Sequence, residues 1–197
     1  MTLAARFTRF RRRLRADGIK GSAAIEFALI APVFFILLMG TIETGVIFFA
    51  QSTLQNAVND TARMVRTGQT GCFTTSGGNC VAMTQAQFRT QICSEASDIL
   101  QDCNGASLQF DVQAYSSGFS SASNSSPLDG SGNLPVLTKF DVGNACDVVL
   151  VRAYYKWPVF TPILGFFLEN IAGGFHLIST AAAFRNEPYN AQQNGCS

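Results

Sequence analysis

The sequence predicts an α+β protein, in which a long N-terminal membrane-anchoring helix precedes a small antiparallel sheet domain reinforced by disulfides. Three observations predict this fold class. An apolar run begins at Ser22, and helical spacing continues from it to about Thr67. Three later segments have the composition of strands, at 107–115, 146–157 and 175–185. All the cysteines follow the apolar run: Cys72, Cys80, Cys93, Cys103, Cys146 and Cys196.

The apolar run is long enough to cross a membrane. A helix needs about 20 residues to span the hydrocarbon core, and Glu26 is the sole ionisable residue between Ser22 and Ile42. Further apolar residues extend the predicted span to residues 22–50. The alternative is a buried helix of a soluble protein. However, apolar residues occur on all sides of this helix, and the rest of the chain is too short to surround it.

An amphipathic half follows the predicted span, over residues 51–68. Its apolar positions recur at intervals of three or four, and Gly68 and Gly71 provide stop signals. We therefore divide the chain into a basic cytoplasmic leader (1–21), a long helix (22–68) and an extracytoplasmic α+β domain (69–197). The apolar positions of the second half are Leu54, Ala57, Val58, Thr61, Ala62 and Val65.

Charge and cysteine usage both predict the orientation in the membrane. Residues 1–20 hold six arginines and one lysine against one aspartate, a net charge of +6, whereas the remainder carries −5. Positive segments stay in the cytoplasm, and cysteines confined to the other side fit disulfides in an oxidising compartment. Nucleic-acid binding is the competing interpretation of an arginine-rich leader. Because the leader directly precedes the predicted membrane span, we interpret its positive charge as a determinant of membrane orientation. We therefore expect no nucleic-acid partner.

Glu26 is an unusual residue in a membrane segment. A buried, unpaired carboxylate costs several kcal/mol. Glu26 lies near the cytoplasmic edge, so its side chain can avoid that cost without a partner in two ways. It can reach water, or it can take up a proton. The third way is a cationic partner from another chain. The physics of the sequence leaves these alternatives open.

Residues 21–27, "GSAAIEF", resemble the processing site of type IV prepilins. In that group a membrane aspartic peptidase cuts after the glycine and removes a basic leader. The resemblance implies that Gly21 and Ser22 flank the cleaved bond and that Glu26 is the fifth mature residue. One departure is that mature type IV pilins often begin with an aromatic residue, whereas this chain would begin with Ser22.

More narrowly, residues 21–68 resemble the TadE-like family of tight-adherence (Tad, Flp-type IVb) pilus systems. The shared order is small residues, Glu-Phe, an apolar run with proline, a second glutamate before glycine, and an Ala/Gln/Asn-rich helix. Residues 146–189 resemble the family moderately, and 72–135 only loosely. The resemblance implies a pilin-like fold and a minor pilin or pseudopilin that takes part in pilus assembly and cell adhesion.

The resemblance also implies location and partners. The protein would lie in the bacterial inner membrane, with its N-terminus cytoplasmic and its C-terminal domain periplasmic, or be incorporated into the extracellular pilus. Its partners would be the membrane, a prepilin peptidase, other pilin or pseudopilin subunits and the assembly machinery. Glu26 would serve subunit assembly by pairing with the α-amine of a neighbouring subunit. Such a pair would fix the axial register between helices, as buried polar residues do in coiled coils.

The cysteines leave most of the disulfide map open. Cys72 and Cys80 close a short Gly-rich loop, and we predict that these two form a disulfide. Thr84 and Gln87 form a capping box that starts a helix. An unbroken helix would hold Cys93 and Cys103 about 15 Å apart, too far for a bond. Either the helix ends near Asp98, or these two cysteines pair elsewhere.

Two further features have alternative interpretations. The apolar segment 158–174 could cover the core or lie against the membrane, and we expect it to cover the core. Glu43 follows the apolar run near the outer interface, where we expect it in the headgroups or against a partner, without a catalytic role.

The sequence predicts no enzyme, cofactor, metal or small-molecule substrate. His176 is the single histidine, no CxxC pair occurs, and no phosphate loop or nucleophile elbow is present. Two functions remain. One is a processed pilus subunit, and the alternative is an uncleaved single-pass inner-membrane assembly or binding factor of a secretion or pilus system.

Overall fold

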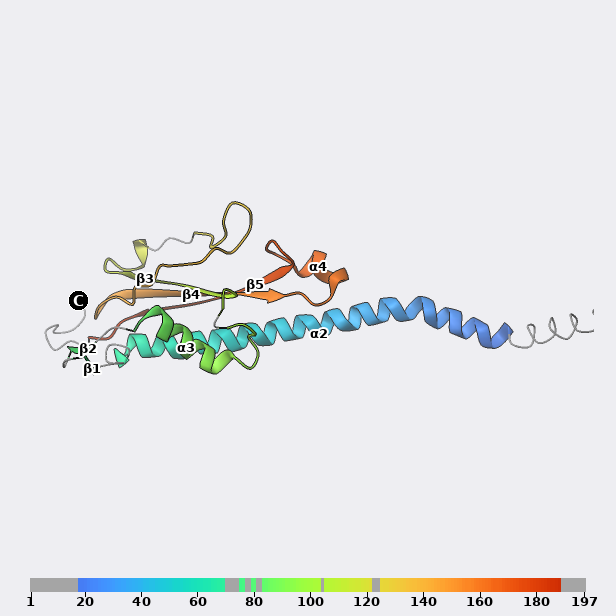
Figure 1. Cartoon of the computed structure of the whole chain (residues 1–197), viewed down its shortest axis with the longest axis horizontal. Coiled ribbons are helices and arrows are strands. Elements are labelled where there is room, and N and C mark those ends of the chain that lie inside the picture. The colour runs from blue at the N-terminus through green and yellow to red at the C-terminus, as the bar shows by residue number, and fades with distance from the viewer. Residues whose placement is uncertain are drawn as a thin grey trace, which may run out of the picture. The chain divides into compact units, whose positions relative to one another are not determined.

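The computed structural model describes residues 18–69, 75–76, 79–80, 83–103, 105–121 and 125–188. It confirms the predicted fold class, since one long helix precedes a small antiparallel sheet (Figure 1). The helices are α2 (Gly18–Arg66), α3 (Gln85–Ala96) and α4 (Pro162–Leu168), with a 3-10 turn η2 (Phe119–Ser121). The strands are β1 (Thr75–Ser76), β2 (Asn79–Cys80), β3 (Leu108–Tyr115), β4 (Val148–Pro158) and β5 (Phe175–Arg185).

The main sheet has the order β3-β4-β5, and both pairs are antiparallel. Val151, at the middle of β4, pairs with Val112 on one side and Ala182 on the other. A parallel bridge from Phe140 to Val112 adds to the open side of β3. The three predicted strands are therefore present, each within two residues of its predicted limits. β1 and β2 form a separate short antiparallel pair.

The chain divides into two compact units, residues 1–42 and residues 43–197, and α2 contributes to both. In the second unit α2 presents one apolar stripe. Its buried members recur at the spacing expected for one helical face. They are Ile47, Ala50, Leu54, Ala57, Val58, Ala62 and Val65. This confirms the amphipathic pattern predicted for the second half of the helix.

The core of the second unit lies between this stripe, α3 and one face of the sheet. Alternate residues of β3 and β4 point into it, among them Phe110, Val112 and Val151. Phe88 of α3 makes edge-to-face contacts with Phe110 and with Phe140, with ring centroids 5.4 and 5.5 Å apart. Two helices therefore cover a sheet that is too small to form a core alone.

The opposite face of the sheet carries a buried ion pair. Asp111 of β3 lies directly across from Arg152 of β4, and the Arg152 guanidinium donates to the Asp111 carboxylate. Gln113 donates to both carboxylate oxygens at 2.8 Å. Residues of the segment 125–139 lie around this pair, and the Arg152 guanidinium also donates to the Ser125 carbonyl at 3.4 Å.

α3 ends early enough for Cys93, within the helix, to form a disulfide with Cys103 in the loop that follows. The predicted capping box is confirmed, because the Thr84 side chain and the Gln87 side chain each accept from the other's backbone N–H. The helix ends at Ala96, and Cys93 bonds to Cys103 with a Cα–Cα distance of 5.7 Å. The first alternative, in which the helix ends before Asp98, is therefore correct. Cys146 is also disulfide-bonded.

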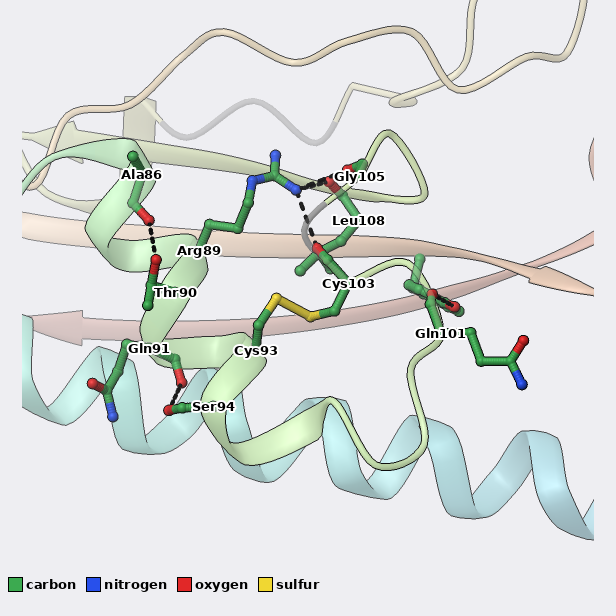
Figure 2. The surroundings of a disulfide bond; sticks show 11 residues. Ala86, Arg89, Thr90, Gln91, Cys93, Ser94, Gln101, Cys103, Gly105 and Leu108 are labelled. Carbon is green, nitrogen blue, oxygen red and sulfur yellow. Dashed lines mark hydrogen bonds between the residues drawn. A yellow bond between two sulfur atoms is a disulfide. The ribbon is translucent and has the colours of Figure 1, made fainter.

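Arg89 holds the same loop from the other side. Its guanidinium donates to the carbonyls of Cys103, Gly105 and Leu108, at 3.4, 3.0 and 2.8 Å (Figure 2). It also lies 4.7 Å from the centroid of the Phe110 ring. The predicted Cys72–Cys80 disulfide remains a prediction, since Cys72 and the Cys80 side chain lie outside the described residues.

We expect two leucines of α2 to differ sharply in their contribution to stability. Leu54 is fully buried, so Leu54→Ala should lower the free energy of unfolding of the second unit by about 3 kcal/mol through lost burial and the cavity left behind. Leu29 is 72% exposed, so Leu29→Ala should change it by less than about 0.5 kcal/mol. Chemical unfolding of the full chain in detergent measures both, and equal effects would contradict this assignment of the core.

Candidate functional site

The first unit of the chain exposes an apolar helix surface. An 18-residue window within Gly21–Arg66 has a mean hydropathy of 2.3, and none of it is buried. Phe27 is 69% exposed. By length and composition this helix is a candidate membrane span near the N-terminus. The exposed side chains of the first unit include Ile25, Phe27, Leu29, Ile30, Val33, Phe34, Phe35, Leu37, Leu38, Met39 and Ile42.

The structure brings two of the predicted site residues together at the start of this surface. The Ser22 hydroxyl donates to the Glu26 carboxylate at 3.0 Å, one helical turn away. Among the side chains that the structure describes, no basic group lies within ion-pair distance of Glu26. A hydroxyl leaves the charge of a carboxylate uncompensated. In a low-dielectric environment that charge requires a cation or a proton.

Gly21 lies in α2 immediately before these two residues. α2 is described from Gly18 onward, and the Gly21–Ser22 peptide bond lies within it. Gly21 is exposed, and no atom lies within 4 Å of the position that a Cβ would take. Glycine lowers the stability of a helix by roughly 1 kcal/mol relative to alanine. The bond is therefore exposed, and it lies in a stretch of α2 that glycine weakens.

Glu43 is buried, although its sequence position predicts a headgroup or partner contact. It is 6% exposed, and its two carboxylate oxygens accept from the backbone N–H groups of Phe160, at 2.5 Å, and Thr161, at 3.1 Å. Thr161 is the N-cap residue of α4 and makes no side-chain cap of its own. The Glu43 carboxylate therefore fixes the loop between β4 and α4 to α2.

α4 does not cover the core, so the prediction for segment 158–174 is wrong in this part. α4 lies where the chain turns from β4 to β5, at the end of the sheet (Figure 1). Its Phe166 and Phe167 are 88% and 78% exposed. The core is instead covered by α2 and α3. Of the segment 158–174, Ile171 is buried.

The described residues offer no catalytic arrangement that we recognise. No group of three or more His, Cys, Asp or Glu among them could hold a metal ion. The His176 Nδ1 lies 2.6 Å from the Leu168 carbonyl. A cavity of about 320 Å³ lies over the Asp111–Arg152 pair. Burial raises the pKa of Tyr154 in its wall, while the nearby Arg152 opposes the shift, so this tyrosine stays neutral.

The comparison with protein families bears on the N-terminal helix. Residues 21–63 match the family model described as TadE-like protein. This segment is similar to the TadE-like family. The matched TadE-like segment contains Gly21, Ser22, Glu26 and Glu43, and it ends three residues before α2 does. No curated protein and no solved structure matches the chain.

The resemblance of residues 146–189 to the family remains a prediction, whereas the TadE-like match confirms the resemblance over residues 21–63. It includes the glutamates at both ends of the apolar run. The role of Glu43 was missed because its partners lie 117 and 118 residues further along the chain. The signal available in the sequence was a second acidic residue at the end of an otherwise apolar run.

We expect Glu43→Gln to loosen the start of α4. The variant replaces charge-assisted hydrogen bonds with one neutral acceptor, so protection of the Phe160 and Thr161 amides should fall by about 30-fold, equivalent to ~2 kcal/mol. Hydrogen exchange of the full chain in detergent measures this. Asp60→Asn, an exposed acid on the same helix, is the control and should leave both amides unchanged. Unchanged protection in Glu43→Gln would contradict the assigned contact.

Proposed function

We propose that the chain is a non-enzymatic minor pilin or pseudopilin that takes part in assembly of a tight-adherence type IV pilus after a prepilin peptidase removes its leader. One observation carries the proposal. The TadE-like segment exposes an apolar helix whose single carboxylate, Glu26, has a neutral hydroxyl as its described partner. Such a surface requires lipid or other apolar helices around it, and in that environment such a carboxylate requires a cation or a proton.

The proposed topology places residues 1–21 in the cytoplasm and residues 51–197 in the periplasm. The leader carries the positive charge that is retained on the cytoplasmic side. The Cys93–Cys103 disulfide supports an oxidising location for the second unit. Residues 22–50 then cross the inner membrane, and the subunit enters the fibre with this helix inside the bundle.

Cleavage supplies the missing charge for Glu26. Cutting the Gly21–Ser22 bond turns the amide of Ser22 into an ammonium group. The hydroxyl of Ser22 already lies on the same side of the helix as the Glu26 carboxylate, so each processed helix presents a cation and an anion to the same neighbour. Pairing between neighbours neutralises both charges and sets the axial offset of the helices. The exposed peptide bond after Gly21 suits the peptidase that makes the cut.

The rival function is an uncleaved single-pass assembly factor, which would keep Met1 and the leader. We expect the mature protein, recovered from membranes and from pili, to begin at Ser22. N-terminal sequencing and intact mass spectrometry measure this directly. Gly21→Leu should block processing, since a bulky residue cannot enter a site shaped for glycine. A mature protein that retains Met1 would reject the processed subunit and favour the assembly factor.

We expect Glu26→Gln to separate processing from assembly. The variant keeps the shape of the side chain and removes its charge, so the leader should still be cut while incorporation into pili falls at least about tenfold, equivalent to ~1.4 kcal/mol. Ser22→Ala is the matched control. It removes the described hydrogen bond but leaves the new amine, so it should assemble normally. Normal pili from Glu26→Gln would refute the charge pair.

A further inference from the structure

We propose that the exposed end of the second unit, formed by Phe160, Ile163, Phe166 and Phe167, inserts into the periplasmic leaflet of the membrane. We call it the α4 surface. The inference rests on the assignment of residues 22–50 as a membrane span. It does not depend on cleavage of the leader or on pilus assembly. The α4 surface would be a second membrane contact of the chain.

The α4 surface is apolar and exposed, although the Phe160 ring contacts the core residue Trp157 edge to face, with ring centroids 6.3 Å apart. Phe160 and Ile163 are each 65% exposed, and Phe166 and Phe167 are more exposed still. The Phe166 and Phe167 rings contact each other edge to face, with centroids 5.3 Å apart, and leave their outer surfaces open. α4 itself contains no charged or hydrogen-bonding side chain. Aromatic side chains in this arrangement suit the boundary between headgroups and acyl chains.

The Glu43 contact fixes the level at which the α4 surface lies. Glu43 directly follows Ile42, the last residue of the uncharged apolar stretch that began after Glu26. Its carboxylate holds the backbone of Phe160 and Thr161, and α4 begins at the next residue, Pro162. Glu43 lies seven residues before the end of the proposed span 22–50, so the backbone bonded to it lies beside the periplasmic end of that span. The α4 surface is therefore at the membrane boundary by chain connectivity.

The same contact explains how Glu43 is accommodated at that depth. Exposed apolar side chains continue past it on α2, with Val46, Phe48 and Phe49 at 41%, 66% and 59% exposure. The lipid-facing surface of α2 thus extends beyond Glu43, so an unpaired carboxylate there would be costly. Two backbone amides from the loop before α4 satisfy it instead. The α4 surface and these α2 side chains form the apolar end of the second unit.

A second protein subunit is the competing occupant, and the observations favour lipid. Protein interfaces combine apolar anchors with hydrogen-bonding groups around them, whereas α4 offers none from its side chains. The exposed Glu169 follows the last residue of α4, where it can remain in the headgroup water while the phenylalanines enter the leaflet.

The test places a tryptophan on the α4 surface of the full chain in vesicles of phosphatidylethanolamine and phosphatidylglycerol. The variants are Phe166→Trp and, as a control, Val136→Trp, which lies in a loop of the same unit and is 73% exposed. Buried Trp157 stays in both variants as a common background. We expect lipid brominated near its headgroup to quench Phe166→Trp, and acrylamide to quench it about threefold less than Val136→Trp.

Two results would overturn the proposal. One is equal acrylamide quenching of the two variants in vesicles that hold the chain alone. The other is protection of Phe166→Trp that arises only when other pilus subunits are added, because that assigns the α4 surface to a protein partner. Hydrogen exchange at Phe160 and Thr161 checks that each variant keeps the Glu43 contact. Glu43→Gln in the Phe166→Trp background should weaken the quenching by brominated lipid.

The outcome is independent of the proposed pilus function. Glu26 lies at the other end of the span, so Glu26→Gln should leave the fluorescence of Phe166→Trp unchanged. If Glu26→Gln does not affect assembly, the proposed charge pair is rejected, and the proposed membrane contact of the α4 surface is unaffected. If the quenching of Phe166→Trp and Val136→Trp is equal, the proposed membrane contact is rejected. The proposed processing and assembly of the chain are then unaffected.

Discussion

The structure depends on a helix that is apolar on all sides over one half and on one side over the other. From Ile47 to Val65 the helix buries a stripe beneath the sheet, and this burial holds the second unit together. From Gly21 to Ile42 the same helix is left open. Because apolar area in water is unfavourable in proportion to its size, that half must obtain its contacts from lipid or from other chains. The fold of the second unit and the membrane attachment thus use one continuous element for two purposes.

The acidic residues at the two ends of the apolar run solve the same problem in different ways. Glu43 is compensated within the chain, by backbone amides that the β4–α4 loop presents to it. Glu26 has only a hydroxyl among its described partners. The first carboxylate is therefore part of the folded subunit, whereas the second is complete only when something else supplies a charge. This difference is the physical basis for our proposal that Glu26 serves assembly, whereas Glu43 serves the structure of the second unit.

Sequence patterns predicted the elements well because the relevant signals are local. Helical spacing located the stripe from Leu54 to Val65, and the capping box at Thr84 located the start of α3. Strand alternation located β3. The contacts that join distant segments were not predictable in this way. Asp111–Arg152 and Glu43 with its loop each link residues far apart in the chain, and neither spacing nor composition shows which distant groups will meet. Segment 158–174 was misplaced because apolar composition alone does not distinguish a segment that faces the core from one that is exposed.

The open half of the helix restricts where the whole protein can exist. A subunit with Phe27, Leu29 and Ile30 exposed has no stable dissolved state, so it can reside in a bilayer or in a bundle of similar helices and nowhere between. In the proposed function, transfer from the bilayer to such a bundle would proceed by direct exchange of neighbours, without release into water. By the same reasoning, any filament that shortens at its base would return its subunits to the lipid phase, where the same molecules are available for another round of growth.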